Sequence, residues 1–269
     1  MGWFHQWRAA RHLRNSSCRE ALAALPPGLE AYWRRSAPQE YQGIRTDAFF
    51  FVRAAEGLLQ FFDVVNRSGL PCALPSEAAD SVWHAWLRWD PAGLACFCSA
   101  HFGAAVPHVE RAGLAAGALF NSYRFCRRRE GITWKGSYLP ALFRLDARLR
   151  MPGGHGYWQR SGRIVYAGLG PRGRRLGRAL PHRELSSEVL YRAGLLHAPL
   201  RASQSGRPRM ADNSGASPMD GVSLAFLGGD ASGRACGDGD GGSAGDSGGG
   251  DGGSSCGSSC GSGCGGGGD

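Results

Sequence analysis

Apolar residues recur at helical spacing through the first 150 residues of the chain. Over 46–65 they form one broad stripe, with Thr46 able to cap the segment and Asn66 to Gly69 ending it. A second apolar stripe starts after Pro75, where Ser76 is a favourable N-cap. Both patterns predict helices, and the breadth of the first stripe predicts that its helix is central.

Residues further along the chain indicate additional helices. Asp90 followed by Pro91 is typical of a helix start, and Gly103 after Phe102 is typical of a helix end. Further elements are expected as a helix at 111–129, a short apolar segment at 139–149, a strand at 163–167 and a helix at 184–196. The pattern predicts a mainly α-helical domain of about 150–160 residues.

The N-terminal segment has aromatic residues at helical spacing and no acidic residue before Glu20. These positions and the arginines beside them are Trp3, Phe4, Trp7, Ala10, Arg8 and Arg11. An organellar presequence and a surface-seeking helix are two interpretations. The more common arrangement is a first helix that docks its aromatic face on the domain, and this is the one we expect.

The C-terminal segment differs sharply in composition. Residues 228–269 hold 20 glycines and no Leu, Ile, Val, Met or aromatic residue. Such a segment cannot bury enough apolar surface to offset the entropy of ordering it. We therefore expect a mainly α, compact helical domain followed by a long disordered Gly/Cys-rich tail, divided as 1–40 (N-terminal helical segment), 41–158 (helical domain), 159–209 (basic Arg/Gly-rich extension) and 210–269 (tail).

Charge is uneven along the chain, whose formal net charge is +9. Residues 159–209 carry 11 arginines against Glu184 and Glu188, so a nucleic acid or an anionic membrane surface is a candidate partner of Arg160 to Arg209. Arg outnumbers Lys 30 to 1 across the chain, which also fits a GC-rich coding bias. A solvated basic segment is the favoured interpretation.

Membrane and redox signals point to a cytoplasmic protein. No segment approaches the ~18 apolar residues of a membrane span, the longest clean run being Ala112 to Phe120. Five cysteines lie among helical patterns and are expected to be buried in a reducing compartment: Cys18, Cys72, Cys96, Cys98 and Cys126. Four lie in the glycine-rich segment, where metal binding or cross-linking stays open: Cys236, Cys256, Cys260 and Cys264.

The most distinctive motifs follow one another in a fixed order. They are Asp80-Ser-Val-Trp83-His84-Ala-Trp86, Phe97-Cys98-Ser-Ala-His101-Phe102-Gly103, Pro107-His108, and Leu139-Pro140-Ala-Leu142-Phe143 continuing through Asp146-Ala-Arg148-Leu149. Over about 45–158 the chain resembles the glycine-rich domain-containing protein-like family, whose biochemical activity is unassigned. Trp86 stands where that family usually has a second histidine. The resemblance implies a helical domain of unassigned activity, and plant members are associated with an RNA-binding segment for which this chain has no matching motif.

Three histidines are the candidate metal ligands. His84, His101 and His108 could converge from two helices and a turn, and three nitrogens with an open position suit Zn²⁺. Trp86 removes the second histidine, and we find no carboxylate at a recognised ligand spacing. A histidine beside Asp80 is more often an ion-paired structural residue, so no cofactor is predicted and zinc is the alternative.

Two other patterns carry less chemistry. Gly168 to Gly173 follows a strand pattern and superficially matches a dinucleotide fingerprint, but no helix is expected to follow, so we predict an Arg/Gly-rich loop. Cys98 and His101 are three residues apart on one predicted helix, and a buried thiol with a nearby imidazole is the expected arrangement.

These observations favour a non-enzymatic helical module that binds an unidentified protein partner. Its binding-surface candidates are Asp80, Trp83, His84 and Arg88. One alternative is a metal-dependent enzyme that uses His84, His101 and His108. The other is nucleic-acid or anionic-surface binding through the arginine-rich residues 160–209.

Overall fold

The computed structural model describes residues 2–109, 115–197 and 223–225. The helices in these ranges are α1 (Gly2–Asn15), α2 (Arg19–Ala23), α3 (Pro27–Glu40), α4 (Ala48–Ser68), α5 (Glu77–Trp89), α6 (Pro91–Phe102), α7 (Ala118–Arg129), α8 (Leu145–Leu149), α9 (Ser187–Arg192) and the 3-10 turns η2 (Leu142–Arg144) and η3 (Arg183–Leu185). The strands are β1 (Cys72–Leu74), β2 (His108–Val109), β3 (His155–Arg160), β4 (Arg163–Gly168), β5 (Leu180–Pro181) and β6 (Ser223–Ala225). The prediction of a mainly helical domain is confirmed for this part of the chain.

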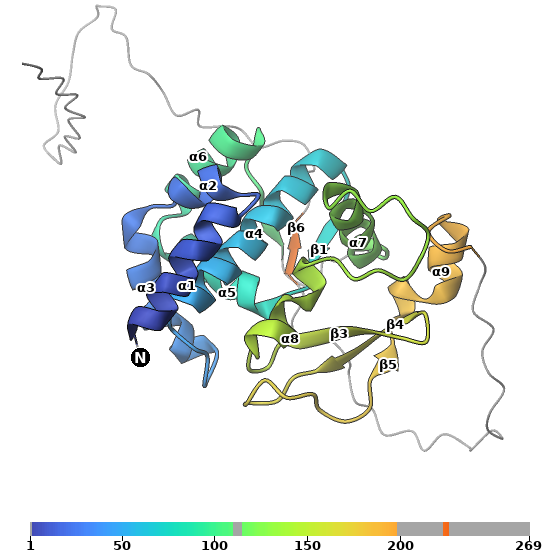
Figure 1. Ribbon diagram of the computed structural model, residues 1–269. Coiled ribbons are helices and arrows are strands. Elements are labelled where there is room, and N and C mark those ends of the chain that lie inside the picture. The colour runs from blue at the N-terminus through green and yellow to red at the C-terminus, as the bar shows by residue number, and fades with distance from the viewer. Residues whose placement is uncertain (1, 110–114, 198–222, 226–269) are drawn as a thin grey trace, which may run out of the picture. The chain divides into compact units, whose positions relative to one another are not determined.

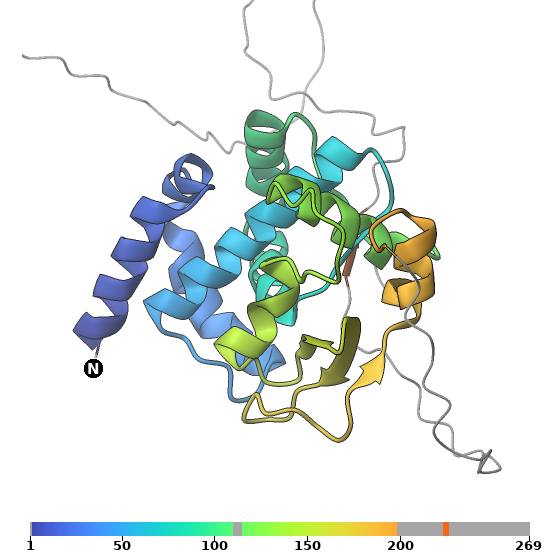
Figure 2. The ribbon, with the colours of Figure 1, turned by 45° about the vertical axis from the view of Figure 1, so that its right-hand side comes forward.

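Helix α4 lies at the centre of the helical region, as its broad apolar stripe predicts (Figures 1 and 2). It packs against α1, α5 and α7. Phe50, Leu58 and Phe61 on α4 are fully buried. Since each large apolar side chain contributes about 1.5–3 kcal/mol when removed from water, this stripe supplies much of the driving force for folding.

Local capping signals set the helix boundaries. Ser76 caps α5 as predicted, its hydroxyl accepting a hydrogen bond from the Ala79 amide at 3.3 Å. Asp90 caps α6 through the Gly93 amide at 2.8 Å. Thr46 does not cap α4; the carboxylate of Asp47 accepts the Phe50 amide at 3.1 Å, so that prediction was wrong by one residue.

Two predicted helices are shorter than expected. Helix α7 starts at Ala118, because Gly117 adopts a left-handed φ of 90° immediately before it. Helix α9 starts only at Ser187, because Ser186 is extended and caps it, and Gly194 adopts a φ of 71° beyond its end. Glycine and serine therefore confine these two helices to less than their apolar patterns suggest.

Two three-stranded sheets accompany the helices. One has the order β3-β4-β5 and the other the order β1-β6-β2, with antiparallel pairing throughout. The strand predicted at 163–167 is confirmed as β4, while its partner β3 was missed. Ser161 and Gly162 form the two-residue hairpin loop with φ of 46° and 72°, as mirror-image hairpin turns require.

Strand β3 crosses the predicted boundary between residues 158 and 159, and the division into four segments stays a prediction. Strand β6 lies within 210–269, so Ser223–Ala225 depart from the expected disorder by pairing with β1 and β2. The rest of the predicted tail, including its four cysteines, lies outside the described residues. Gly168 is the last residue of β4, residues 169–173 form the predicted loop, and the next helical turn begins only at Arg183.

Asp146 ties α8 to the start of α5 and to β3. Its carboxylate accepts hydrogen bonds from the Ser76 hydroxyl at 2.6 Å and from the amides of Glu77, Ala78 and His155 at 2.9–3.0 Å. The side chain is 1% exposed, and burial raises its pKa against the opposing effect of these four donors. This contact fixes α5 in the fold and explains the Asp in the 139–149 motif.

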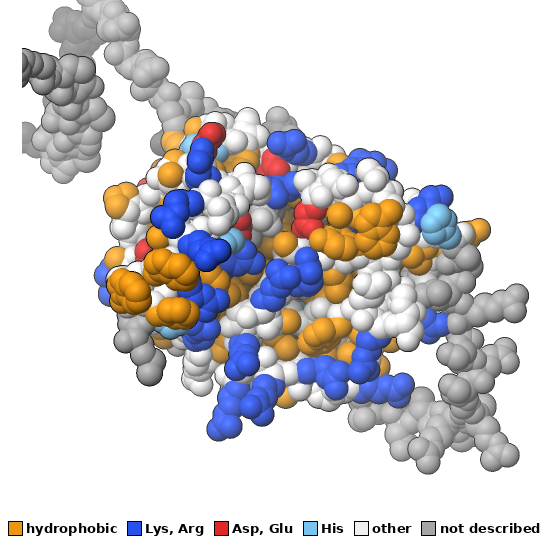
Figure 3. Space-filling view, viewed as in Figure 1, with side chains coloured by type: hydrophobic (Ala, Val, Ile, Leu, Met, Phe, Trp, Pro, Cys, Tyr) orange, Lys and Arg blue, Asp and Glu red, His pale blue; other side chains and the backbone are white. Residues whose placement is uncertain are grey.

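The N-terminal helix α1 docks on α4 with the opposite face from the one predicted. Ala9 is buried, and His12 and Ser16 bond the Glu56 carboxylate at 2.7 and 2.5 Å. Trp3, Phe4 and Trp7 are instead exposed, and hydrophobic side chains gather beside the start of α1 in Figure 3. The prediction failed because the polar residues, rather than the aromatic ones, match the buried acid on α4.

Four of the five core cysteines are buried thiols as expected, while Cys96 is exposed on α6. Burial raises the pKa of Cys98 to about 12, which leaves this thiol protonated. Among the described helices, none combines the length and the apolar character that crossing a lipid bilayer requires.

Candidate metal centre

Helix α5 presents Asp80 and His84 on one face, because residues four apart in a helix lie one turn above the other. His108 reaches the same place from β2. One ligand atom of each residue lies within 4.8 Å of the others. The structure therefore brings together two of the three predicted histidines and adds a carboxylate.

The contacts inside this cluster, the Asp80–His84–His108 site, are short. The two Nε2 atoms of His84 and His108 are 3.1 Å apart. The Asp80 carboxylate lies 3.4 Å from His84 Nε2 through Oδ2 and 3.5 Å from His108 Nε2 through Oδ1. All three groups thus turn their ligating atoms toward one point.

These separations match those around a tetrahedral ion. Zinc lies about 2.0–2.1 Å from imidazole nitrogen and about 2.0–2.2 Å from carboxylate oxygen, so ligand atoms on a tetrahedron are about 3.3 Å apart. The separation of 3.1 Å between the two Nε2 atoms is close to that figure, as are the distances of 3.4 and 3.5 Å from each imidazole to a different oxygen of Asp80. One oxygen of Asp80 and the two nitrogens all lie within 4.8 Å of one another, which is compatible with a shared cation.

Asp80 is the strongest sign of a missing partner. The residue is 4% exposed, and its Oδ1 atom is buried without a hydrogen bond from any described residue. A buried carboxylate is costly unless donors or a cation compensate it. This oxygen lies beside His108 Nε2, where a shared metal ion would compensate both.

Glu40, at the end of α3, fixes the orientation of His84. Its Oε1 lies 2.5 Å from His84 Nδ1, and Oε2 accepts a hydrogen bond from Arg88. A carboxylate at Nδ1 holds the proton there and leaves Nε2 with a free lone pair, which is the arrangement around histidines that bind metals. Nearby, burial and the carboxylate of Asp80 raise the pKa of Tyr41, which therefore remains a phenol.

Trp83 forms the apolar wall of the site. It is fully buried, its ring centroid lies 4.6 Å from that of His108, and it packs against Phe61 and Phe62. The sequence made Trp83 a binding-surface candidate, but a fully buried side chain cannot belong to a binding surface. The side chain of His84 is one-quarter exposed and that of Arg88 about half exposed, so of the four binding-surface candidates these two are the ones that meet solvent.

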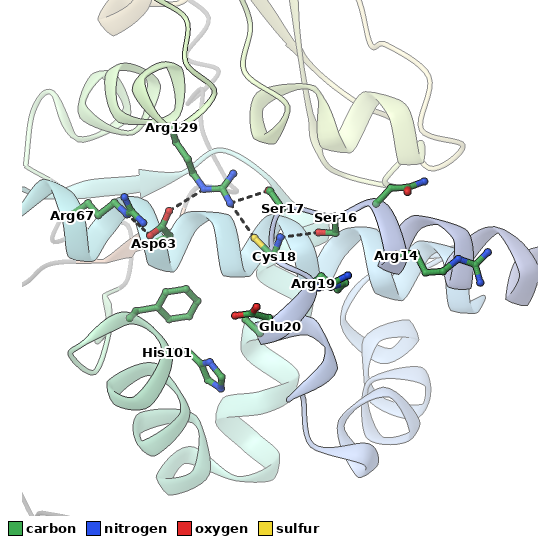
Figure 4. Close-up of a pocket in the computed structure, with 13 residues that line it drawn as sticks. Arg14, Ser16, Ser17, Cys18, Arg19, Glu20, Asp63, Arg67, His101 and Arg129 are labelled. Carbon is green, nitrogen blue, oxygen red and sulfur yellow. Dashed lines mark hydrogen bonds and ion pairs between the residues drawn. The ribbon is translucent and has the colours of Figure 1, made fainter.

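His101 does not join the other two histidines. It is exposed on α6, and its ring lies 4.4 Å from that of Phe97. Figure 4 shows it at the rim of a different pocket, a cavity of about 540 Å³ that is also lined by Cys18, Glu20 and Arg129. The convergence of three histidines that the metal alternative requires therefore does not occur, and Asp80 lies with His84 and His108 instead.

The charges of the second pocket are largely paired with one another. Asp63 bonds Arg67 at 2.5 Å and Arg129 at 2.9 Å, and Arg129 also reaches the hydroxyl of Ser17 and the thiol of Cys18 at 3.1 Å (Figure 4). Burial raises the pKa of the Cys18 thiol, so it is not an activated nucleophile. This arrangement joins α1, α4 and α7.

The comparisons with known proteins concern the same part of the chain. Residues 34–166 match the model of the UCP032817-like family. The matched region spans just under half of the chain and includes Glu40, Asp80, His84 and His108. No curated protein and no solved structure matches the chain. The site thus lies wholly within the matched region.

The sequence did not indicate Asp80 or Glu40 as parts of a metal site. Asp80 was predicted as an ion-pair partner of His84 and as a binding-surface candidate, although an Asp and a His four residues apart can both face one ion. Glu40 offered no local signal, because its contact with His84 spans 44 residues. Only the packing of α3 on α5 reveals it.

Proposed function

We propose that the protein binds a divalent transition-metal ion at Asp80, His84 and His108, with Zn²⁺ as the best match. The observation that carries this proposal is the buried Asp80 carboxylate, whose Oδ1 lacks a hydrogen-bond donor among the described residues and lies beside His108 Nε2, while its Oδ2 lies beside His84 Nε2. Two nitrogens and one oxygen suit zinc better than magnesium or calcium, which prefer oxygen ligands alone.

With three protein ligands, a zinc ion keeps one position for water. Structural zinc sites are closed by four protein ligands, whereas catalytic sites leave one position open. His84 is 26% and His108 16% exposed, so solvent has access to this position. This arrangement supports the metal-dependent alternative over the non-enzymatic module, with Asp80 in place of His101; a zinc ion held by these residues would supply Lewis-acid chemistry at the site.

The other functional interpretations remain proposals. The resemblance to the glycine-rich domain-containing protein-like family is one of them, and it is supported by the motif residues Asp80, His84 and His108 lying together in one site. Nucleic-acid binding through 160–209 rests on the arginines there, of which Arg172, Arg174 and Arg175 lie exposed in the β4–β5 connection.

The metal proposal is tested by zinc titration calorimetry on the full chain with the variants His84→Ala and His101→Ala. We expect the wild-type protein and His101→Ala to bind one more zinc ion than His84→Ala. Because the cysteines are identical in all three proteins, zinc bound by thiolates contributes equally to each. Equal stoichiometry in the wild-type protein and His84→Ala would refute the proposal.

A further inference from the structure

The outward face of α1 exposes three large aromatic side chains. Trp3 is 76%, Phe4 53% and Trp7 45% exposed, and the rings of Phe4 and Trp7 are stacked with centroids 6.4 Å apart. Single exposed apolar residues are common on protein surfaces, but a continuous aromatic group on one helix face marks an interaction site.

Arginines accompany these rings. The guanidinium of Arg11 lies 5.6 Å from the Trp7 ring centroid, whereas that of Arg8 lies 4.0 Å from the ring centroid of Phe49 on α4. Arg14 continues the row one turn further, and the first acidic residue in the sequence is Glu20. The exposed face of α1 is therefore aromatic and cationic, with no anionic side chain among its residues.

The opposite face of α1 is held firmly to the domain. Arg53 joins His12 and Ser16 at the buried carboxylate of Glu56, contacting it at 2.9 Å, and His5 lies 3.3 Å from Asp47. These contacts fix the rotation of the helix about its axis. The aromatic residues consequently point away from the protein in a fixed direction, without a separate cost for ordering the helix.

The protein surface around α1 is also positively charged. In Figure 3, Lys and Arg side chains spread over the face that carries α1, α8 and the β3–β5 sheet, while few Asp or Glu side chains are visible. A cationic face with aromatic side chains at its edge complements an extended anionic surface. Tryptophan prefers the interface between headgroups and acyl chains, and arginine pairs with anionic headgroups.

We propose that α1 binds anionic lipid bilayers, with Trp3, Phe4 and Trp7 entering the headgroup region and Arg11 and Arg14 pairing with lipid phosphates. Amphipathic helices of this kind lie in the plane of the interface and bury their apolar face to about 5–10 Å. The proposal is independent of the metal site, because none of these residues contacts Asp80, His84 or His108.

The test is co-sedimentation of the full chain with vesicles of phosphatidylcholine alone or of phosphatidylcholine and phosphatidylglycerol. We expect binding to the anionic vesicles only, and a loss of more than about 30-fold in the triple variant Trp3→Ala, Phe4→Ala, Trp7→Ala. The matched control removes three exposed apolar side chains outside α1, α8 and the β3–β5 sheet, Leu70, Trp134 and Tyr191, which are 40%, 52% and 43% exposed. This control variant should bind as the wild-type protein does.

The cationic contribution is tested separately. Arg11→Gln combined with Arg14→Gln should weaken binding to anionic vesicles by about 25-fold, and salt should weaken the binding of the wild-type protein. Brominated acyl chains should quench tryptophan fluorescence in the wild-type protein and not in Trp3→Phe, Trp7→Phe. Equal sedimentation of the aromatic triple variant and the wild-type protein would overturn the proposal, as would self-association through this face in sedimentation velocity without vesicle binding.

Discussion

Two buried carboxylates, Asp80 on α5 and Asp146 of α8 beside the start of α5, differ in how many hydrogen bonds they accept. Asp146 receives four hydrogen bonds, which occupy both of its oxygens. Asp80 is also buried, yet its Oδ1 has no donor among the described residues and both of its oxygens face imidazole nitrogens. A saturated carboxylate holds a structure together, whereas an unsaturated one beside two potential ligands is suited to bind a cation.

The largest effect is expected at Asp146, to which we assign a structural role. Asp146→Asn would turn amide hydrogens toward two of the four donors, so we expect a loss of about 3 kcal/mol or more in the free energy of unfolding, measured with urea. Asp90→Asn is the matched control, because Asp90 caps α6 through one contact and asparagine caps equally well. A loss below about 1 kcal/mol in Asp146→Asn would contradict the structural role.

Asp80→Asn tests the proposed metal-binding role of the other buried carboxylate. Asp80→Asn removes a proposed ligand and should reduce zinc affinity by at least about 100-fold, which is more than the loss of a residue that only orients a ligand. Without metal, the same change removes a buried charge whose Oδ1 has no hydrogen-bond donor among the described residues, so the free energy of unfolding at pH 8 should stay unchanged or rise by up to about 1 kcal/mol. Zinc titration and urea unfolding of the metal-free protein measure the two effects. Destabilisation comparable to that of Asp146→Asn would erase the distinction between the two carboxylates.

A smaller effect is expected at Glu40, which orients His84 without facing the proposed ion. Glu40→Gln keeps an acceptor at His84 Nδ1 but removes its charge, so zinc affinity should fall by about 10-fold. Glu30→Gln, also on α3 but paired with Arg34 at the surface, is the matched control and should leave the affinity unchanged. Unchanged zinc affinity in Glu40→Gln would remove Glu40 from the account of the site.

The sequence was most informative where the structure depends on local chemistry. Ser76 and Asp90 are side-chain caps whose partners lie three residues away, and the boundaries of α5 and α6 followed from them. Strand β3 was missed because its hairpin partner, rather than its own pattern, defines it. The orientation of α1 was missed because it depends on Glu56, more than 40 positions further along the chain.

The candidate site likewise combines residues that the local sequence indicates with residues that only the packing reveals. His84 was recognised from its motif, and His108 from its turn, but the choice between Asp80 and His101 as the third ligand depends on how α5, α6 and β2 pack. His101 and Asp80 are equally good ligand types in the sequence. Only the three-dimensional arrangement places the carboxylate with the imidazoles and directs His101 toward the pocket beside Cys18.

The most direct test of the metal centre is zinc K-edge X-ray absorption on the full chain loaded with one equivalent of zinc. The account predicts nitrogen and oxygen neighbours at about 2.0–2.2 Å, with the outer-ring scattering of two imidazoles and no sulfur at about 2.3 Å. Sulfur neighbours would assign the ion to cysteines. Light-atom neighbours that persist unchanged in His84→Ala would place it at another site, and either result would contradict a centre built by Asp80, His84 and His108.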